Sequence, residues 1–228
     1  MTTAATKLGV LLPFIGLAAC AGVGGTELGE DRGWTLAHNN LHQIDGPPPR
    51  PGQDDRAFRV YRSGAPSRNT FAEWCEVYGI ERVIVLNGDA SNRELAYQSD
   101  GLCPDIEVLY DVKQDHGAPV SDGFLELFDA AVARAREDEV GLLFRCRTGS
   151  HRAGRTAAYY QMKHRGVEVE DALEIMTRKG VAMWALNPVL VPQVRAMDDY
   201  IRGRPCAQPD EYCVEIDSSK WVPSHSTQ

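Results

Sequence analysis

The middle of the chain joins an apolar run, a short loop with a glycine and a helix-like segment in direct succession. The apolar run covers residues 140–144, and the helix-like segment covers 153–164. Between them the loop reads Cys146-Arg147-Thr148-Gly149-Ser150-His151-Arg152. A strand that passes through a tight loop into a helix is the building unit of α/β folds. The succession therefore predicts an α/β protein with this loop at the carboxyl end of a strand.

The residue types of the loop fit the binding of a phosphate group. Backbone N–H groups and a helix N-terminus can converge on one anion, and the same field favours the thiolate of a cysteine such as Cys146. An arginine at position 152 can add a bidentate fork on two phosphate oxygens. A chance pairing of a buried cysteine with a surface arginine is the alternative, but the basic flanks and the strand–loop–helix context favour the phosphate loop. The predicted phosphate-binding residues are Arg147, Thr148, Gly149, Ser150, His151 and Arg152.

Strand-like and helix-like segments alternate along the rest of the chain. Apolar or alternating runs predict strands, and apolar positions at helical spacing predict helices. We expect one domain whose mostly parallel sheet of four to five strands is flanked by helices, with the late helices on one face. The predicted strands are 58–62, 82–86, 106–110 and 140–144, and the predicted helices are a segment capped by Asn69 or Thr70 and ending at Tyr78, then 91–99, a segment capped by Ser121 or Asp122 and ending at Arg136, and 153–164, 169–179 and 188–202.

The amino terminus has the pattern of an export signal. After Lys7 comes an apolar run, residues 8–19, which is shorter than the ~20 residues that span a bilayer. Leu17-Ala18-Ala19-Cys20 resembles the lipobox of bacterial lipoproteins, which implies a lipid on Cys20. Ala21 after the cysteine then implies the periplasmic face of an outer membrane, if the cell has two membranes. An ordinary secretory signal cut nearby, or a buried helix, is the alternative.

Composition divides the chain into four parts. We expect a signal peptide at 1–19, a glycine- and proline-rich tether at 20–55, a catalytic domain at 56–203 and a tail at 204–228. Trp34, Leu36, Leu41 and Ile44 indicate that the middle of the tether packs on the domain. The net charge of −8 argues against nonspecific nucleic-acid binding, and we expect a monomer.

Four of the six cysteines remain after Cys20 and Cys146 are assigned. Export exposes them to an oxidising compartment, where disulfides form. Cys206 and Cys213 flank Pro209-Asp210 and suit a small closed loop, which leaves Cys75 and Cys103 as a second pair. The alternative is four reduced thiols, with Cys75 a core residue.

Several motifs together resemble the cysteine-based protein tyrosine phosphatase superfamily, in particular its compact dual-specificity branch and the bacterial relatives. The resemblance covers about 58–203 and implies a phosphatase-like fold. In addition to the Cys146 loop, three segments carry the resemblance: Tyr61-Arg62-Ser63-Gly64-Ala65-Pro66, Gly79-Ile80-Glu81-Arg82-Val83-Ile84-Val85-Leu86 and Asp115-His116-Gly117-Ala118-Pro119.

The resemblance implies hydrolysis of a phosphomonoester through a phosphocysteine, without a metal or cofactor. Cys146 would be the nucleophile, Arg152 would stabilise the transition state, and Asp115 would act as general acid. Asp115 is preferred because its glycine and proline neighbours suit a mobile, hinged loop. Asp111 and Asp122 remain competing acids. The substrate would be a protein carrying phosphotyrosine, phosphoserine or phosphothreonine, or a small phosphorylated molecule.

Two residues beside the loop depart from the family pattern. Arg145 stands where members usually carry histidine, and Ala153 stands where they carry a serine or threonine that assists the second step. Arg145 could hold the thiolate by charge or point away, and Thr156 or a water could replace the hydroxyl. These departures keep open an envelope-anchored phosphate-binding pseudophosphatase or sensor. A thiol-redox protein ranks lower, because no Cys-x-x-Cys accompanies Cys146.

Overall fold

A computed structural model of the protein describes residues 39–44, 58–179 and 187–216. The signal peptide, Cys20, Trp34, Leu36, most of the tether and the end of the tail lie outside the described residues. Five strands form one sheet in the order β1-β2-β5-β3-β4, and only β1 runs antiparallel to its neighbour. The strands are β1 (His42–Gln43), β2 (Arg59–Ser63), β3 (Ile80–Val85), β4 (Glu107–Asp111) and β5 (Gly141–Arg145). The predicted α/β class and mostly parallel sheet are confirmed.

The strand β5 lies inside the sheet, between β2 and β3, and all five of its residues are buried. A strand buried on both faces is expected to be continuously apolar, as Leu142, Leu143 and Phe144 are. It starts at Gly141, where a Cβ would lie 2.9 Å from the carbonyl oxygen of Gly79. The sheet therefore places whatever follows β5 near the middle of its carboxyl edge.

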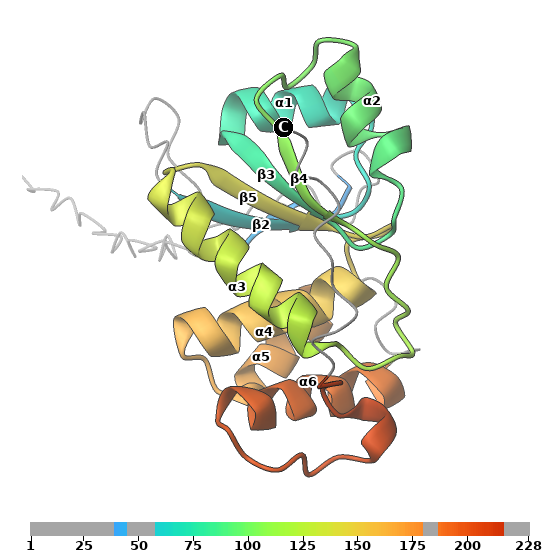
Figure 1. Ribbon diagram of the computed structural model, residues 1–228, viewed down its shortest axis with the longest axis vertical. Helices are drawn as coiled ribbons and strands as arrows, with labels where there is room; N and C mark the ends of the chain where they lie inside the picture. Colours follow the sequence, from blue (N-terminus) through green and yellow to red (C-terminus); the bar gives the residue numbers. More distant parts are fainter. Residues whose placement is uncertain (1–38, 45–57, 180–186, 217–228) are drawn as a thin grey trace, which may run out of the picture.

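Helices cover both faces of the sheet (Figure 1). Helices α1 (Arg68–Tyr78) and α2 (Glu94–Ser99) lie on one face, where Phe71, Trp74 and Leu143 belong to one apolar core. The other face carries the larger core, around Phe128 and Phe144. Its helices are α3 (Asp122–Glu137), α4 (His151–Arg165), α5 (Val169–Lys179) and α6 (Asn187–Ile201). The late helices thus pack together, as the sequence predicts.

Local details differ from the prediction at two helix starts. Ser67, rather than Asn69 or Thr70, caps α1, because its side chain accepts the N–H of Thr70. The predicted helix 91–99 is a 3-10 turn, η2 (Ala90–Asn92), followed by α2. Asp111 accepts the N–H of Ala90, a long-range contact that fixes this turn and is invisible in local sequence. Helix α3 begins with Ser121 as its cap, one of the two predicted candidates.

The two ends of the described chain are tied to the domain. Residues 39–44, assigned to the tether from composition, carry β1, and Leu41 is buried. At the other end, Cys206 and Cys213 form a disulfide around the short turn η4 (Asp210–Tyr212). Glu215 then pairs with Ser121, just ahead of α3. A second disulfide joins Cys75 to Cys103. Among the described residues no helix is both long and apolar enough to cross a bilayer.

Candidate active site

The loop after β5 begins with Cys146, which is 1% exposed and is the described cysteine that carries a free thiol. Its N–H donates to the carbonyl oxygen of Ser63, at the end of β2, over 3.2 Å. One residue later, the carbonyl oxygen of Arg147 accepts the N–H of Ala65 over 3.1 Å. The loop is therefore bonded to the turn that follows β2, which is the Ser63-Gly64-Ala65-Pro66 segment singled out in the sequence.

Gly149 is required at its position in the loop. Its φ of +74° is in the left-handed region, which glycine adopts without steric cost. A Cβ there would lie 2.5 Å from the nitrogen of Gly64 and 2.6 Å from the carbonyl carbon of Ser63. No side chain fits between these two backbones. The glycine noted in the sequence thus permits the close packing of the loop on the end of β2.

Arg152, in the first turn of α4, lies at the same edge of the sheet. Its Nη1 donates to the carbonyl oxygens of Leu86, after β3, and Gln114, after β4, over 3.0 and 3.3 Å. Within the described chain its Nε and Nη2 make no hydrogen bond. Two donors of the guanidinium fork are therefore available for an anion held by the loop.

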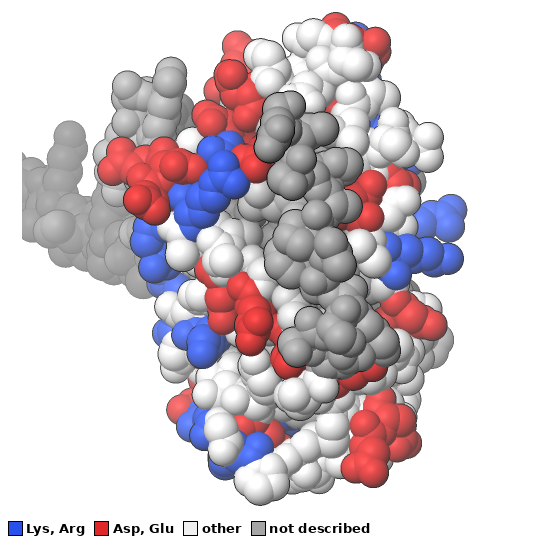
Figure 2. Space-filling view, in the orientation of Figure 1, with Lys and Arg blue, Asp and Glu red and all other residues white. Residues whose placement is uncertain are grey.

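The other predicted phosphate-binding residues also lie in this loop. Arg147 and Thr148 are exposed, Gly149 and Ser150 are buried, and His151 is half-buried. Ser150 is the residue before α4, and its side chain does not cap the helix. The ring of His151 lies 6.2 Å from the ring of His116, on the opposite loop. Figure 2 shows lysine and arginine side chains at both edges of this face, interspersed with aspartate and glutamate.

Arg145 does not serve the thiol, because two carboxylates take up its charge. Its guanidinium is fully buried and forms a fork with the equally buried Glu94, over 2.8 and 2.5 Å. A third contact joins Nη1 to Asp89 over 2.6 Å. Burial alone would lower the pKa of Arg145, but the hydrogen bonds and charges of Glu94 and Asp89 raise it above the ordinary value. Arg145 is thus a structural cation beneath η2 and α2, the second of the two fates considered from sequence.

Arg155 lies one helical turn beyond Arg152 and is 1% exposed. It donates to the carbonyl oxygens of Asp115 and Ala118, over 3.2 and 3.0 Å, and to the side chains of Gln114 and Gln193. Burial and the neighbouring charge of Arg152 lower its pKa to about 10, so it remains a cation at neutral pH. Arg155 therefore holds the loop 114–118 onto α4 instead of lying in solvent.

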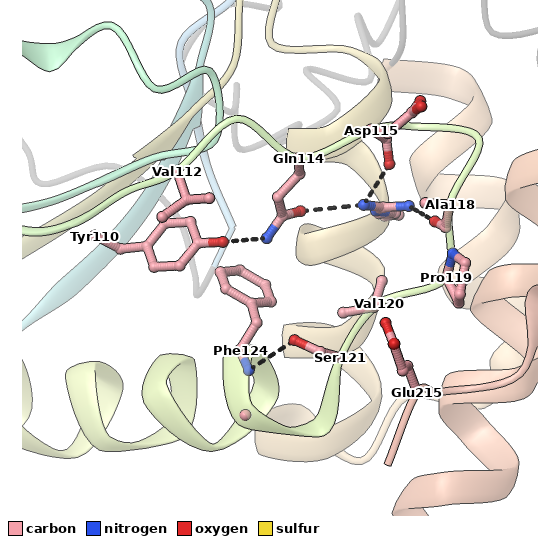
Figure 3. Close-up of a pocket in the computed structure, with 12 residues that line it drawn as sticks. Tyr110, Val112, Gln114, Asp115, Ala118, Pro119, Val120, Ser121, Phe124 and Glu215 are labelled. Atoms are coloured by element: carbon pink, nitrogen blue, oxygen red, sulfur yellow. Dashed lines mark hydrogen bonds between the residues drawn. The ribbon is translucent and has the colours of Figure 1, made fainter. Parts of the chain in front are cut away.

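Asp115, the predicted general acid, lies on this held loop with its carboxylate turned outward. The side chain is 73% exposed, and Figure 3 shows it directed away from Gln114 and the pocket. Its Oδ1 accepts the N–H of Gly117 over 2.8 Å, and this hydrogen bond is the main reason that the pKa of Asp115 is lowered. The loop brings the backbone of residue 114 to Arg152, but in this conformation the carboxylate is not brought to Cys146.

The competing acids have structural contacts of their own. Asp111 accepts the N–H of Ala90 with both carboxylate oxygens, over 3.1 and 3.3 Å. Asp122 is the first residue of α3, is buried, and accepts the N–H of Gly123. Asp115 is thus the exposed carboxylate on the loop that touches Arg152, and it remains the candidate with freedom to turn.

Position 153, where the resemblance leads one to expect a serine or threonine, carries no hydroxyl. Ala153 is completely buried, and the hydroxyl of Thr156 donates to the carbonyl oxygen of Arg152 over 3.0 Å. This contact within α4 occupies the proton of Thr156. Thr156 therefore does not replace the missing serine or threonine in this arrangement.

A cavity of about 220 Å³ lies behind the loop 114–118. Tyr110, Gln114, Phe124 and Glu215 line it, and Figure 3 shows the amide of Gln114 facing the hydroxyl of Tyr110. Burial raises the pKa of Tyr110. The cavity lies beneath the loop that carries the candidate acid, and neither Cys146 nor Arg152 lines it. In the described residues no group of histidine, cysteine and carboxylate side chains is arranged to hold a metal ion.

Three features of the site were not predicted. The first is the position of Arg155 beside the site, which spacing could have indicated, because Arg152 and Arg155 stand at i and i+3 and share a face of α4. The second is the pairing of Glu94 with Arg145 and of Gln193 with Arg155. No sequence pattern indicates it, because a polar residue in an amphipathic helix is expected to face water. The third is the contact of Asn40 with the carbonyl oxygen of Thr148, which no local pattern indicates because it joins residues 108 positions apart.

Comparison with known proteins gives matches in structure alone. No protein-family model and no curated protein matches the chain. The crystal structure of P. aeruginosa TpbA in complex with pTyr is similar, with a TM-score of 0.50 at 18% identity, over 75% of this chain and 88% of that one. The crystal structure of PTPMT1 in complex with PI(5)P gives a TM-score of 0.52 at 15% identity, over 72% and 97%. The chain therefore has the fold of these two proteins.

Proposed function

We propose that this chain, which has the fold of phosphatases of the protein tyrosine phosphatase type, hydrolyses phosphomonoesters at Cys146. One observation carries the proposal. The free thiol of Cys146 and the two unbonded donors of Arg152 lie at the ends of one short loop, between a central strand and the first turn of α4. A thiolate nucleophile and a cationic fork around one anion are the parts that phosphoryl transfer requires.

The reaction would take two steps. The thiolate of Cys146 attacks phosphorus, a sulfur–phosphorus bond forms, and the bond from phosphorus to the substrate oxygen breaks. Asp115 gives its proton to the leaving oxygen after the loop has turned the carboxylate inward. Water then attacks the phosphocysteine, Asp115 takes back a proton, and inorganic phosphate and the thiolate are released. Arg152 binds the equatorial oxygens in both steps.

The proposed substrate is a phosphomonoester on a protein or on a small molecule. TpbA was crystallised with pTyr and PTPMT1 with PI(5)P, both of which carry a phosphomonoester on a ring. Exposed Arg147 and Lys113 follow β5 and β4, at the edge of the sheet that carries the loop. They support a substrate that carries further negative charge, on a protein or on a small phosphorylated molecule.

Hydrolysis of p-nitrophenyl phosphate by the reduced protein tests the proposal. We expect Cys146→Ser to abolish turnover and Arg152→Lys to reduce kcat/KM by at least about a hundredfold, because lysine keeps the charge but loses the fork. Arg195→Lys, at an exposed arginine of α6 outside the loop, is the matched control and should change kcat/KM by less than about threefold. Turnover that survives Cys146→Ser would refute the phosphocysteine.

A phosphate-binding protein with slow turnover is the second candidate, because Ala153 and Thr156 offer no hydroxyl to the thiolate. On this reading phosphocysteine forms and then breaks down slowly, so a burst of p-nitrophenol precedes a slow steady rate. Ala153→Ser should raise the steady rate about fivefold, the effect of one hydrogen bond, while Ala157→Ser one turn later should not. Vanadate binding without any turnover would favour the binding role.

We also propose that Cys20 carries a lipid and holds the domain at the cell envelope of a bacterium, on the periplasmic face of the outer membrane where there is one. The support is the residue pattern around Cys20 and the two disulfides, which suit an oxidising compartment. Labelling cells with radioactive palmitate should mark the wild-type chain and not Cys20→Ala. Equal label on both would refute the anchor.

A further inference from the structure

A short segment ahead of the domain, residues 39–44, is fastened against the sheet and α4; we call it the strap. Its strand β1 pairs with β2. Beyond β1, the N–H of Ile44 donates to the carbonyl oxygen of Val60 over 2.9 Å, and Gln161 of α4 donates to the carbonyl oxygen of Ile44 over 2.6 Å. Leu41, within the strap, is buried in the apolar core. The strap therefore has a defined position relative to β2 and to α4, the helix that follows the phosphate loop.

The other end of the strap contacts the phosphate loop itself. Asn40 donates its side-chain N–H to the carbonyl oxygen of Thr148 over 3.1 Å. The carbonyl oxygen of Asn39 accepts the N–H of Gly64, on the turn against which the loop packs. A Cβ on Gly149 would lie 3.0 Å from the amide nitrogen of Asn40. Three backbone segments, the strap, the turn and the loop, are thus packed in direct contact.

Hydrogen-bonding rules fix which way the Asn40 amide faces. A carbonyl oxygen only accepts, so the NH₂ group of Asn40 must face Thr148 and its Oδ1 must face away. That Oδ1 lies 2.6 Å from Nε2 of His42, which is 6% exposed, and the contact is a hydrogen bond only if Nε2 carries a proton. His42 therefore orients Asn40, and Asn40 in turn holds the Thr148 carbonyl.

The direction of this carbonyl matters for an anion site. A carbonyl oxygen carries partial negative charge, so one that turned into the loop would repel a bound phosphate and remove part of the positive field. Asn40 bonds the Thr148 oxygen on the strap side, and the peptide unit cannot rotate without breaking that bond.

We propose that Asn40, oriented by His42, is a positioning residue for the phosphate loop, so that this one side chain of the strap belongs to the anion-binding machinery. The inference rests on the proposed function of that loop and extends it to a segment that composition assigns to the tether. The chain between the strap and Cys20 then links the envelope anchor to a segment that supports the site.

Two matched substitutions in the full chain test the proposal. Asn39 and Asn40 both have left-handed backbones, with φ of +52° and +56°, which glycine accepts without strain. Within the part of the chain that the structure describes, the side-chain nitrogen of Asn39 has no hydrogen-bond partner, so Asn39→Gly makes the same chemical change without removing a contact to the loop. We expect Asn40→Gly to weaken vanadate binding about fivefold to tenfold, as for one lost hydrogen bond to a site, and Asn39→Gly to change it by less than twofold.

A second pair of variants separates positioning from general stability. His42→Leu removes the donor to Asn40, whereas His42→Gln keeps an N–H donor, so vanadate affinity should fall in the first and be largely restored in the second. This pair decides the matter if Asn40→Gly does not fold. Equal vanadate affinity in Asn40→Gly and Asn39→Gly, or in the two His42 variants, overturns the inference.

The failure of the inference and of the proposed function can be told apart. If the wild-type chain binds vanadate but does not turn over p-nitrophenyl phosphate, the enzyme proposal fails and the Asn40 comparison still reports on the loop. If it turns over substrate and Asn40→Gly is unchanged in kcat/KM and vanadate affinity, only the inference fails. A wild-type chain that binds neither vanadate nor phosphate refutes both.

Discussion

Arg145 shows how a residue next to a proposed nucleophile can contribute to stability alone. It directly precedes Cys146 in the sequence, but its Nε and Nη2 donate to Glu94 and its Nη1 donates to Asp89. A buried cation and its two carboxylates stabilise one another, because each charge compensates the lost hydration of the other. The atypical residue at this position therefore does not by itself argue for or against catalysis.

Replacing Arg145 should destabilise the fold severely, because Glu94 would remain buried without a partner. We expect Arg145→Met to lower the free energy of unfolding by about 3–5 kcal/mol in urea titrations, and the double variant with Glu94→Met to recover most of the loss. Arg195→Met breaks an exposed pair with Glu170 and should cost less than about 1 kcal/mol. A stable Arg145→Met protein that has lost vanadate affinity would instead assign Arg145 to the anion.

Asp115 determines the expected pH dependence. The Gly117 N–H lowers the pKa of Asp115, so the carboxyl is ionised at neutral pH in this conformation. A general acid must be protonated, so its active fraction falls as the pH rises through that lowered pKa. The basic limb of kcat/KM should then lie in the acid range with phenyl phosphate, whose leaving group needs the proton.

Asp115→Asn should remove this basic limb and reduce kcat/KM by about a hundredfold or more, with vanadate affinity little changed. Asp111→Asn and Asp122→Asn are the comparison variants, and the pH profiles of all three are measured together. If the limb disappears in one of these two and persists in Asp115→Asn, the acid is wrongly assigned. A limb near neutral pH would mean that Asp115 leaves Gly117 in the free enzyme.

At the scale of elements, α4 and α6 together hold the loop 114–118. Arg155 of α4 donates to the carbonyl oxygens of Asp115 and Ala118, and Gln193 of α6 donates to those of His116 and Ala118. The two side chains also bond to each other over 2.7 Å. A loop held through four backbone contacts has a defined starting position, from which a short turn of Asp115 is the remaining motion.

Gln193→Glu should separate the two roles of this contact. The carboxylate still accepts from Arg155 but cannot donate to the loop carbonyls, so the loop should loosen while the buried arginine stays paired. We expect faster amide hydrogen exchange over residues 115–118 and a fall in kcat of about fivefold, with KM for p-nitrophenyl phosphate within twofold. Unchanged exchange in this loop would show that Arg155 alone holds it.

At the scale of the whole molecule, disulfides secure regions on opposite sides of the sheet. Cys75–Cys103 joins α1 to the segment before β4, across 28 residues, and Cys206–Cys213 closes 7 residues of the tail. The tail disulfide stands just ahead of Glu215, whose N–H and carbonyl oxygen bond to Val120 and Asp122 at the start of α3. The tail thus supports the far end of the loop that carries Asp115.

Loop length predicts unequal contributions from the two disulfides. Closing 28 residues should stabilise the fold by about 3.6 kcal/mol and closing 7 by about 2.4 kcal/mol, in the chain-entropy description. Paired Cys→Ala variants, compared by urea unfolding, measure both. The Cys206→Ala/Cys213→Ala variant should also speed hydrogen exchange at the Asp122 amide. A larger loss from the tail pair than from Cys75–Cys103 would contradict this order.

The sequence by itself determined the α/β class, the strand–loop–helix unit around Cys146 and the order of the elements that follow. These depend on local periodicity and on residue types, such as Gly149, that few others can replace in a tight loop. Local patterns also placed Cys146 and Arg152 at the two ends of one loop.

Only the tertiary structure decided which charges serve the site and which serve the fold. Arg145 and Arg155 look alike in sequence, yet one pairs with Glu94 and Asp89, while the other holds the loop of Asp115. Asn40 joins the phosphate loop only because β1 lies beside β2. Such roles depend on partners far away in the chain, and a buried polar group takes its meaning from the partner that compensates its lost hydration.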